Sequence, residues 1–538
     1  MSNRICRQKT AIGLFIILLV ILMSSKVAGE ETKPASSELG LAERIQQVVD
    51  RPEFRHASFG IEFYSLDTGK PVYMLNADRL FTPASTTKLL TEGTALELLG
   101  ADYRFHTRVY RDGSLEADGT LKGDLILVAS GDPNLSGRVR PDSTLSFENV
   151  DHTYAGSPDT RPVPGDPLLV IRELAQQVAH GVKRVEGNVR VDNSLFAEGD
   201  ADRGTDVIIS PMAVNDNVID VTASPGGAVG APVKLEVSPA TTYTRFVNQA
   251  KTGPADCKPE IKWETDVTDP DGRHTVTVTG NMPLSKPPIL FAYPVPQPYR
   301  FAEMVLVEAL REKGVVVVKA EPRRPDFRFP TASYAPENVV AEHISPPLSE
   351  EVKVTLKVSL NLHAGMTPYI LGAVVNHRSS DAAQAGFDLE REFLQKAGLD
   401  LSGASQGDGE GGAPSAFFTP DFMVHYLAYM AKQKDFPVFF SALPVLGRDG
   451  TLWNIQTNSP AAGQVHAKTG TFGAYDALNR RLMLTGKGLA GYMVTPGGRH
   501  LAFALYVNHV SLPLDDEAAT KVVGQALGEI AAAAYLSQ

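Results

Sequence analysis

The two ends of the chain carry the same combination of secondary structure, and a long stretch of different character separates them. Near the N-terminus LAERIQQVVD has helical spacing, FGIEFYSLDTGKPVYML predicts a β-hairpin, and FTPASTTKLLTEGTALELLG predicts a helix that ends at Gly100. The C-terminal part is again helical and closes with the hairpin-like LAGYMVTPGGRHLAFALYVNHV and an alanine-rich helix. This pattern predicts one α+β domain, an antiparallel sheet with helices, interrupted by an insertion.

The insertion differs from its flanks in composition. Short strand-like runs such as GDLILVAS, VKLEVSP and HTVTVTGN alternate with Gly, Pro, Asn and Asp, and two segments have helical spacing, PLLVIRELAQQVAHG and FAEMVLVEALREKG. We therefore expect a mostly β insertion of two small domains. The predicted organisation is a signal peptide over residues 1–29, the first part of the α+β domain over 30–100, the insertion over 101–335, and the second part of the α+β domain over 336–538.

The first residues have the three-part layout of a secretory signal. Basic residues precede the apolar run AIGLFIILLVILM, and SSKVAG follows it, with Val27 and Gly29 at the expected cleavage positions. The apolar run is short for a bilayer span, so an uncleaved membrane anchor is the weaker alternative. The sequence predicts export to the periplasm or cell envelope, with at most peripheral membrane contact.

Charge and cysteine content exclude some classes of protein. The net charge of -11 argues against nucleic acid as a partner. The two cysteines, Cys6 in the basic start and Cys257 in a loop-like stretch, provide no disulfide framework. Cys6 also precedes the apolar run, which does not fit a lipoprotein acylation site.

Ser85 and Lys88 stand three residues apart where an extended segment is expected to become a helix. Residues at this spacing share one helix face, so the hydroxyl and the amine come within contact distance. The dipole and free N–H groups of the first turn favour a developing negative charge on Ser85. A neutral lysine would accept the serine proton, which requires burial or a second cation to lower its pKa. An ordinary helix cap beside a solvated lysine is the alternative.

Two further motifs bear on this choice. Ser359 and Asn361 in Ser-Leu-Asn offer a hydroxyl for proton relay and an amide for a substrate. Lys-Thr-Gly occurs twice, at 251–253 in a polar stretch without a strand pattern and at 468–470 before the terminal hairpin, and the second copy is the predicted one. Ser-x-x-Lys, Ser-x-Asn and Lys-Thr-Gly, in this order, form a set that occurs in β-lactamases and penicillin-binding proteins.

The third motif suggests how a substrate binds. On a strand, Lys468 and Thr469 would bind a substrate carboxylate, and Gly470 leaves room for backbone pairing along the strand edge. Lys468 is also a candidate for the second cation that keeps Lys88 neutral.

The sequence resembles the low-molecular-mass class C penicillin-binding proteins, the D-alanyl-D-alanine carboxypeptidase/endopeptidase family. SGDPNL, MAVNDNVIDV and LPVLGRDGTL before HAKTGT carry the likeness, which spans the chain from about Leu41 to the C-terminus. Ser85 and Ser359 lie 359 − 85 = 274 positions apart, as in a family that inserts two domains between its motifs. The resemblance implies a penicillin-binding, transpeptidase-like domain that holds all three motifs.

The resemblance also implies roles for the motif residues. The expected catalytic residues are the acylated nucleophile Ser85, its general base Lys88, the proton-transfer and amide-binding pair Ser359 and Asn361, and the carboxylate-binding Lys468. The expected substrate-binding residues are Thr469, Gly470, Thr471 and Asp132. Backbone N–H groups of Ser85 and Thr471 would form the oxyanion hole. Asp132 either reads an amino group on the peptide or simply forms a turn.

Three segments depart from the family pattern. Leu360 stands where Asp or Asn is common, DGEGGAPSAFFTP from Asp408 replaces a serine- and arginine-containing segment, and FGAYDALNRRLMLTGKG after Thr471 is longer than usual. The second and third differences affect expectations about substrate recognition and the pocket rim. They leave the three motifs intact.

The predicted function is an exported serine DD-peptidase that hydrolyses D-alanyl-D-alanine or D-alanyl-diaminopimelate bonds of peptidoglycan stem peptides, with β-lactams as covalent inhibitors. A serine β-lactamase or esterase, and a peptidoglycan-binding protein that has lost turnover, are the alternatives. Neither a cofactor nor a metal is expected, because His363 and His466 beside the motifs are more typical of hydrogen-bonded pocket-wall or surface residues than of ligands.

Overall fold

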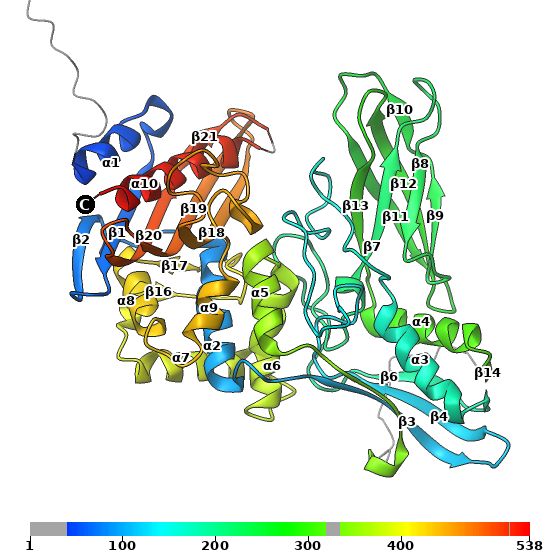
Figure 1. The fold of residues 1–538 in the computed structure, drawn as a ribbon. Coiled ribbons are helices and arrows are strands. Elements are labelled where there is room, and N and C mark those ends of the chain that lie inside the picture. Colours follow the sequence, from blue (N-terminus) through cyan, green and yellow to red (C-terminus); the bar gives the residue numbers. More distant parts are fainter. Residues whose placement is uncertain (1–39, 319–333, 516, 538) are drawn as a thin grey trace, which may run out of the picture. The chain divides into compact units, whose positions relative to one another are not determined.

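The computed structural model describes residues 40–318, 334–515 and 517–537, so the predicted signal peptide lies outside the described residues. Helices and mostly antiparallel sheets alternate through these ranges (Figure 1), which confirms the predicted α+β class. No helix of the described ranges combines the length and apolar character needed to cross a bilayer.

One sheet joins the two ends of the described chain. Its strands run in the order β18-β19-β20-β1-β2, and all pairs are antiparallel. The strands are β1 (Ser58–Ser65), β2 (Lys70–Leu75), β18 (Val465–Asp476), β19 (Arg481–Val494) and β20 (His500–Asn508), with β21 (Val510–Leu512) paired to β19. The N-terminal hairpin and the C-terminal hairpin predicted from the sequence therefore form neighbouring parts of one sheet.

Strand β20 shows why this sheet needs helices on both faces. Its residues alternate between two hydrophobic clusters. Phe503 and Leu505 pack with α1 (Leu41–Val49) and α10 (Gln525–Tyr535), whereas Ala504 and Tyr506 pack with α2 (Lys88–Leu99) and α8 (Pro420–Met430). This alternation follows from the two-residue period of a strand. The helices associated with the sheet are α1 (Leu41–Val49), α2 (Lys88–Leu99), α5 (Leu348–Val358), α6 (Asn361–Val374), α7 (Ala382–Lys396), α8 (Pro420–Met430), α9 (Phe436–Ala442) and α10 (Gln525–Tyr535). A small ladder of β16 (Ala404–Ser405) and β17 (Phe417–Phe418) lies between α7 and α8 in the sequence.

The segment between α2 and α5 contains three further sheets. The first has the order β14-β5-β4-β3-β15 with β6 on β4, the second β13-β7-β8, and the third β10-β12-β11 with β9 on β12. Their strands are β3 (His106–Leu115), β4 (Thr120–Val128), β5 (Arg184–Val185), β6 (Val189–Asp192), β7 (Val218–Ser224), β8 (Lys234–Ser238), β9 (Thr244–Asn248), β10 (Lys251–Gly253), β11 (Glu260–Thr268), β12 (His274–Pro283), β13 (Ile289–Pro294), β14 (Val316–Val317) and β15 (Val339–Ile344).

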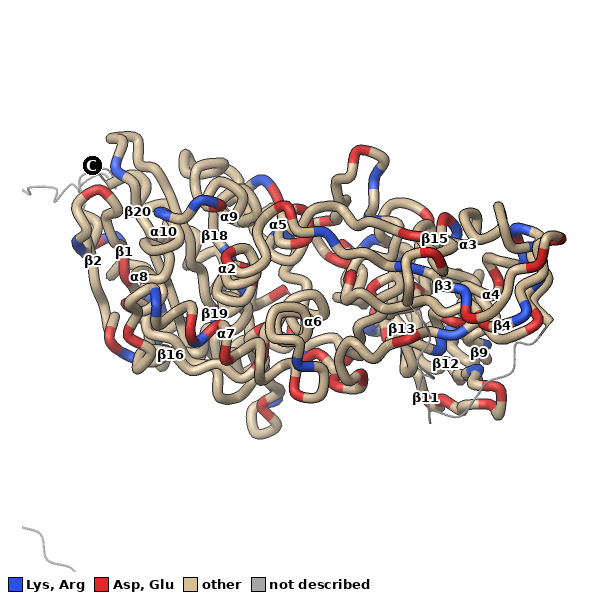
Figure 2. The backbone as a smooth tube through the Cα atoms, turned by 90° about the horizontal axis from the view of Figure 1, so that it is seen from below, with Lys and Arg blue, Asp and Glu red and all other residues tan. Residues whose placement is uncertain are grey.

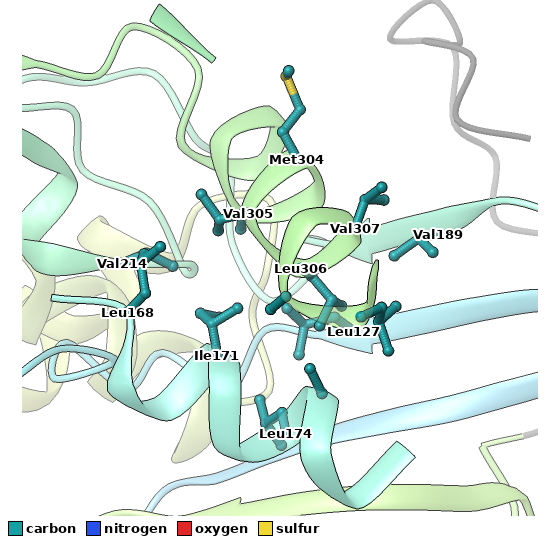
Figure 3. Close-up of a cluster of buried hydrophobic side chains, with 14 of the residues drawn as sticks. Leu127, Leu168, Ile171, Leu174, Val189, Val214, Met304, Val305, Leu306 and Val307 are labelled. Carbon is teal, nitrogen blue, oxygen red and sulfur yellow. The ribbon is translucent and has the colours of Figure 1, made fainter. Parts of the chain in front are cut away.

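Two helices give this segment a core of its own. Apolar side chains of α3 (Leu169–Gly181) and α4 (Pro298–Glu312) gather beside strand β4, as Figure 3 shows for Ile171, Leu306 and Leu127. The three side chains are fully buried. Acidic and basic residues are interspersed along the described chain (Figure 2), so the acidic surplus is not confined to one element.

Two details bear on the predicted organisation. Strand β15 pairs with β3, so residues beyond 335 take part in a sheet of the predicted insertion. The domain boundaries stay predictions. The pairing of β15 with β3 favours an end of the insertion after β15 rather than at residue 335. The expectation that 251–253 lack strand structure is wrong, because these residues form β10, which pairs in parallel with β12.

Candidate active site

Ser85 lies in a short 3-10 helix, Ala84–Thr87, that leads directly into α2. Its neighbour Ala84 has a φ of 46°, a left-handed conformation that costs a non-glycine residue about 1 kcal/mol or more. Thr86 Oγ1 donates to Pro83 O at 2.8 Å and the Lys88 N–H donates to Ser85 O, so the turn is fixed on both sides of the serine. The sequence expectation of a serine in the first turn of a helix therefore agrees with the structure.

The amine of Lys88 joins the first two motifs. Lys88 Nζ lies 2.9 Å from Ser85 Oγ, 2.7 Å from Asn361 Oδ1 and 3.0 Å from the backbone oxygen of Glu410. The side chain is 0% exposed, and burial lowers its pKa to about 8, although nearby carboxylates oppose the shift, with Glu410 the largest of them. The lysine can therefore lose its proton close to neutral pH.

The second motif begins at a helix end. Ser359 is the C-cap of α5 in a left-handed conformation, with φ 65° and ψ 34°, and Asn361 is the first residue of α6. Tyr154 donates its hydroxyl to Ser359 O at 2.5 Å, which holds the connection between the two helices. Residue 360, where the sequence departs from the family, is a buried leucine in a small apolar cluster.

Lys468 of β18 joins the second motif to the third. Its Nζ donates to Ser359 Oγ at 2.7 Å and to Thr469 O at 2.8 Å. Burial, and then the positive charges of Lys88 and Lys487, hold the pKa of Lys468 well below its usual range. Burial is the main cause of the lowered Lys88 pKa, and the role of Lys468 as a second cation beside Lys88 stays a prediction.

Gly470 allows β18 to lie against the nucleophile segment. A Cβ at this position would lie 2.4 Å from Pro83 O and 3.1 Å from the Ser85 backbone nitrogen. Beside it, Ser85, Ser359, Thr469 and Thr471 line a cavity of about 340 Å³. The three motifs, far apart in the sequence, therefore meet at one cavity.

Asp132 does not line this cavity. It is 1% exposed, and its Oδ1 accepts a hydrogen bond from the Asn134 N–H at 2.9 Å, as in an Asx turn. His343 Nε2 lies 3.6 Å from its other carboxylate oxygen, and burial raises the pKa of Asp132 to about 7. These contacts favour the turn-forming alternative.

Some residues at the site carry no motif and were missed by sequence reasoning. Tyr154 contributes its hydroxyl from within the insertion, and Lys487 of β19 and Thr451 also line the cavity. Lys487 and Glu410 have an indirect sequence signal, since each lies in a segment that departs from the family pattern, and Thr451 lies in LPVLGRDGTL. The backbone oxygen of Glu410 accepts from Lys88, and burial raises the pKa of the Glu410 carboxyl group to about 7.

A buried ionic network lies behind the second motif. His363, two residues after Asn361, places Nε2 2.7 Å from Asp216 Oδ1 and Nδ1 2.7 Å from Glu351 Oε1. Burial alone would lower the pKa of His363, but these two carboxylates outweigh burial and raise the pKa to about 10. The ring is therefore charged at neutral pH. The network ties α6 to the insertion through Asp216. His466, by contrast, stacks on Phe440 with ring centroids 4.2 Å apart.

The same network contains a group with metal-ligand chemistry. Ligand atoms of Asp151, His152 and Asp216 lie within 4.8 Å of one another. Arg138 Nη2 contacts both carboxylates, Asp151 at 2.5 Å and Asp216 at 2.7 Å, and all four side chains are buried. The guanidinium therefore supplies the positive charge that these carboxylates require.

Comparisons with known proteins agree with this geometry. A family model described as the D-Ala-D-Ala carboxypeptidase 3 (S13) family matches residues 41–533. The D-alanyl-D-alanine carboxypeptidase of Actinomadura sp. is 29% identical over 500 residues, 88% of this chain and 82% of that protein. The carboxypeptidase DacB of Haemophilus influenzae is 24% identical over 454 residues, 81% of this chain and 82% of that protein.

A solved structure shares the fold. The crystal structure of penicillin binding protein 4 (dacB) from Haemophilus influenzae superposes with a TM-score of 0.68 at 19% identity, covering 92% of this chain and 99% of that chain. The same protein in complex with a β-lactam gives a TM-score of 0.66 at 20% identity, with the same coverage of both chains.

The close approach at Gly470 predicts the effect of a methyl group there. Gly470→Ala should lower the free energy of unfolding by about 1–3 kcal/mol, because β18 must move away from Pro83. Gly227→Ala is the matched control, since Gly227 is exposed and a Cβ there meets nothing within 4 Å. Urea unfolding of both variants tests this, and equal stability of the two would contradict it.

The charged state of His363 predicts a pH dependence of stability. Its folded pKa is raised to about 10 from the ordinary value of 6.5, so its charge stabilises the fold fully below pH 6.5, and this contribution is lost as the pH rises toward 10. The difference in unfolding free energy between wild type and His363→Gln should therefore be larger at pH 6.5 than at pH 9.5. Exposed His180→Gln serves as control, and a constant difference for His363→Gln would refute the charged ring.

Proposed function

Because this chain belongs to the D-Ala-D-Ala carboxypeptidase 3 (S13) family and is a serine-type DD-peptidase, we propose that it hydrolyses peptidoglycan stem peptides through an acyl-enzyme on Ser85. The bonds it cleaves are the D-alanyl-D-alanine bond, the D-alanyl-diaminopimelate cross-link, or both. The single observation that carries the assignment to Ser85 is the buried Lys88 amine, 2.9 Å from its hydroxyl.

Acylation begins with proton transfer from Ser85 to Lys88. The neutral amine accepts the hydroxyl proton while Oγ attacks the carbonyl carbon of the penultimate D-alanine, and the carbonyl oxygen becomes an oxyanion. The backbone N–H groups of Ser85 and Thr471 stabilise this oxyanion. Gly470 supports this geometry, since its lack of a side chain leaves β18 against the Ser85 amide.

Collapse of the tetrahedral intermediate breaks the peptide C–N bond. The leaving amine takes up a proton, which the Lys88 ammonium returns through the hydroxyl of Ser359. Lys468, which donates to Ser359 Oγ, orients that hydroxyl. A water molecule then attacks the acyl ester while Lys88 takes one of its protons, and Lys88 returns that proton to Ser85 Oγ as the ester C–O bond breaks, which releases the peptide acid and regenerates Ser85.

Thr469 and Thr471 line the cavity and provide hydroxyl groups for the carboxylate of the peptide. Asn361 and Lys468 lie behind the residues that line the cavity; in this proposal Asn361 holds a backbone amide of the peptide and Lys468 donates to the same carboxylate. A β-lactam acylates the same serine and acts as a covalent inhibitor, as the β-lactam complex of the Haemophilus influenzae relative supports.

Cellular location and domain organisation are parts of the proposal. We infer that residues 1–29 direct export, after which the enzyme works in the periplasm or cell envelope, where its substrate lies. Residues 30–100 and the residues after β15 up to 538 form the catalytic domain, and the β-rich segment from residue 101 through β15 forms the insertion, since β15 pairs with β3.

Fluorescent penicillin tests the nucleophile. Wild-type protein should form a covalent, gel-stable adduct, and Ser85→Ala should form none, because the acyl ester needs the serine oxygen. Ser402→Ala, a change at an exposed serine, should label like wild type. Labelling of both wild type and Ser85→Ala, or of neither, would overturn the assignment.

The lifetime of the adduct separates two functions. A label that persists for many minutes agrees with a peptidase, whereas rapid loss of the label would favour a β-lactamase. Release of D-alanine from a muropeptide shows turnover and excludes a protein that only binds.

The lowered pKa of Lys88 predicts how acylation depends on pH. The neutral amine is the base, and its pKa is about 8, so the second-order rate of penicillin acylation should rise about tenfold per pH unit below 8 and level off above it. Lys88→Arg keeps the charge at all these pH values and should lose acylation by about 100-fold or more. Stopped-time labelling from pH 6 to 9 measures both effects, and a flat wild-type profile would be inconsistent with Lys88 as the base.

A further inference from the structure

We propose that Lys487 is a specificity-determining residue which, together with Thr471, receives the free C-terminal carboxylate of the peptide substrate. The inference rests on the proposed function, since it names a group that recognises the substrate of that same site. Lys487 belongs to none of the three motifs, and it lies in the β19 part of the segment that is longer than usual for the family.

The position of Lys487 is set by strand pairing. Residue 487 of β19 lies opposite Thr471 of β18, so both side chains project from the same face of the sheet. Lys487 Nζ donates to Thr471 Oγ1 at 2.5 Å. Both residues line the cavity that also contains Ser85 and Ser359. The amine therefore ends inside the catalytic cavity, next to Thr471, the exposed threonine that follows the third motif.

The neighbours of Lys487 in the strand fix its direction. Gly486 and Gly488 lie against the nucleophile segment: a Cβ on Gly486 would be 2.7 Å from Thr82, and one on Gly488 would be 3.0 Å from Thr86. Because successive residues of a strand face opposite sides, Lys487 projects to the other side. There it passes the π-helix Ala519–Gly524, where a Cβ on Gly524 would lie 3.7 Å from Lys487 Cε.

The charge of Lys487 has no anionic partner among the described residues. The residue is 6% exposed, and burial lowers its pKa to about 8. No carboxylate of the described chain lies within ion-pair distance of its amine, and Glu517 at the same cavity is paired with Lys521 instead. A buried ammonium that contacts only a hydroxyl is costly, and an anionic ligand group would remove that cost.

A carboxylate fits the available donors. Lys487 offers its remaining ammonium protons, and the hydroxyl of Thr471 can donate to the same anion, which makes charge-assisted hydrogen bonds. Lys468 is already held by Ser359 Oγ and its own strand, so Lys487 adds a second positive charge at the Thr471 end of the cavity. The enzyme should therefore prefer a peptide with a free terminal carboxylate over the same peptide ending in a carboxamide.

The test compares two thioester analogues of a D-alanyl-D-alanine peptide, one with a terminal carboxylate and one with a terminal carboxamide. In wild type kcat/KM should favour the carboxylate, and Lys487→Met should reduce this carboxylate-to-carboxamide ratio by about tenfold or more, the usual effect of losing a hydrogen bond to a charged group. Lys487→Arg keeps a cation and should retain most of the ratio. Lys434→Met removes the same charge from an exposed lysine that does not line the cavity, and should leave the ratio as in wild type.

Stability distinguishes this role from a structural one. Lys487→Met replaces a buried unpaired charge by an apolar side chain of similar length, so the unfolding midpoint in urea should not fall. If Lys487→Met lowers the urea midpoint but leaves the carboxylate-to-carboxamide ratio unchanged, the role of Lys487 is structural. If the Met variant does not fold, Lys487→Gln is measured in its place.

The outcomes also separate the inference from the proposed function. If wild-type protein is not labelled by penicillin, the function fails. If wild type is labelled and the carboxylate-to-carboxamide ratio of Lys487→Met and Lys487→Gln stays within about twofold of wild type, the inference alone is overturned.

Discussion

The burial of one amine, that of Lys88, is the constraint on which the site depends. An exposed lysine would keep its proton at neutral pH, and its hydrogen bonds to Ser85 and Asn361 would have only the strength of a surface contact. Burial requires α2 to be covered on that side, and the cover comes from α6 and from the backbone of Glu410. The same cover brings Asn361 within reach of the nucleophile. The burial of Lys88 is therefore required both for the packing of α2 and for the chemistry of the site.

Sequence patterns predicted the parts whose signal is local. The period of apolar residues predicted the helices and hairpins, and the spacing of Ser85 and Lys88 predicted their contact, which the structure has at 2.9 Å. The reason for choosing the second Lys-Thr-Gly copy was incomplete, since both copies lie on strands. What distinguishes the second copy in the structure is that β18 lies against the Ser85 segment.

The residues that sequence reasoning missed depend on tertiary contacts. Lys487 enters the cavity because β19 pairs with β18 in one register, and Tyr154 reaches Ser359 from a loop about 200 positions earlier. Neither has a motif around it. The buried position of Asp132 likewise depends on which side of its turn is covered, and the turn sequence alone leaves both readings open. Register and burial are properties of the whole fold, so local patterns cannot fix them.

The pairing of β1 with β20 has a consequence for how the enzyme comes to be folded. Ser58 and Asn508 are partners although 508 − 58 = 450 positions separate them, so the central sheet cannot close until nearly the whole chain is present. Closing so long a loop is slow, whereas the segment with α3 and α4 has mostly nearer partners and its own core. Until β20 has been made, β1 lacks this partner strand, and its unpaired edge can pair with other chains and cause aggregation. A nascent chain that stops before β20 would carry the serine and the lysine without the sheet that assembles them, which makes activity a late event in folding.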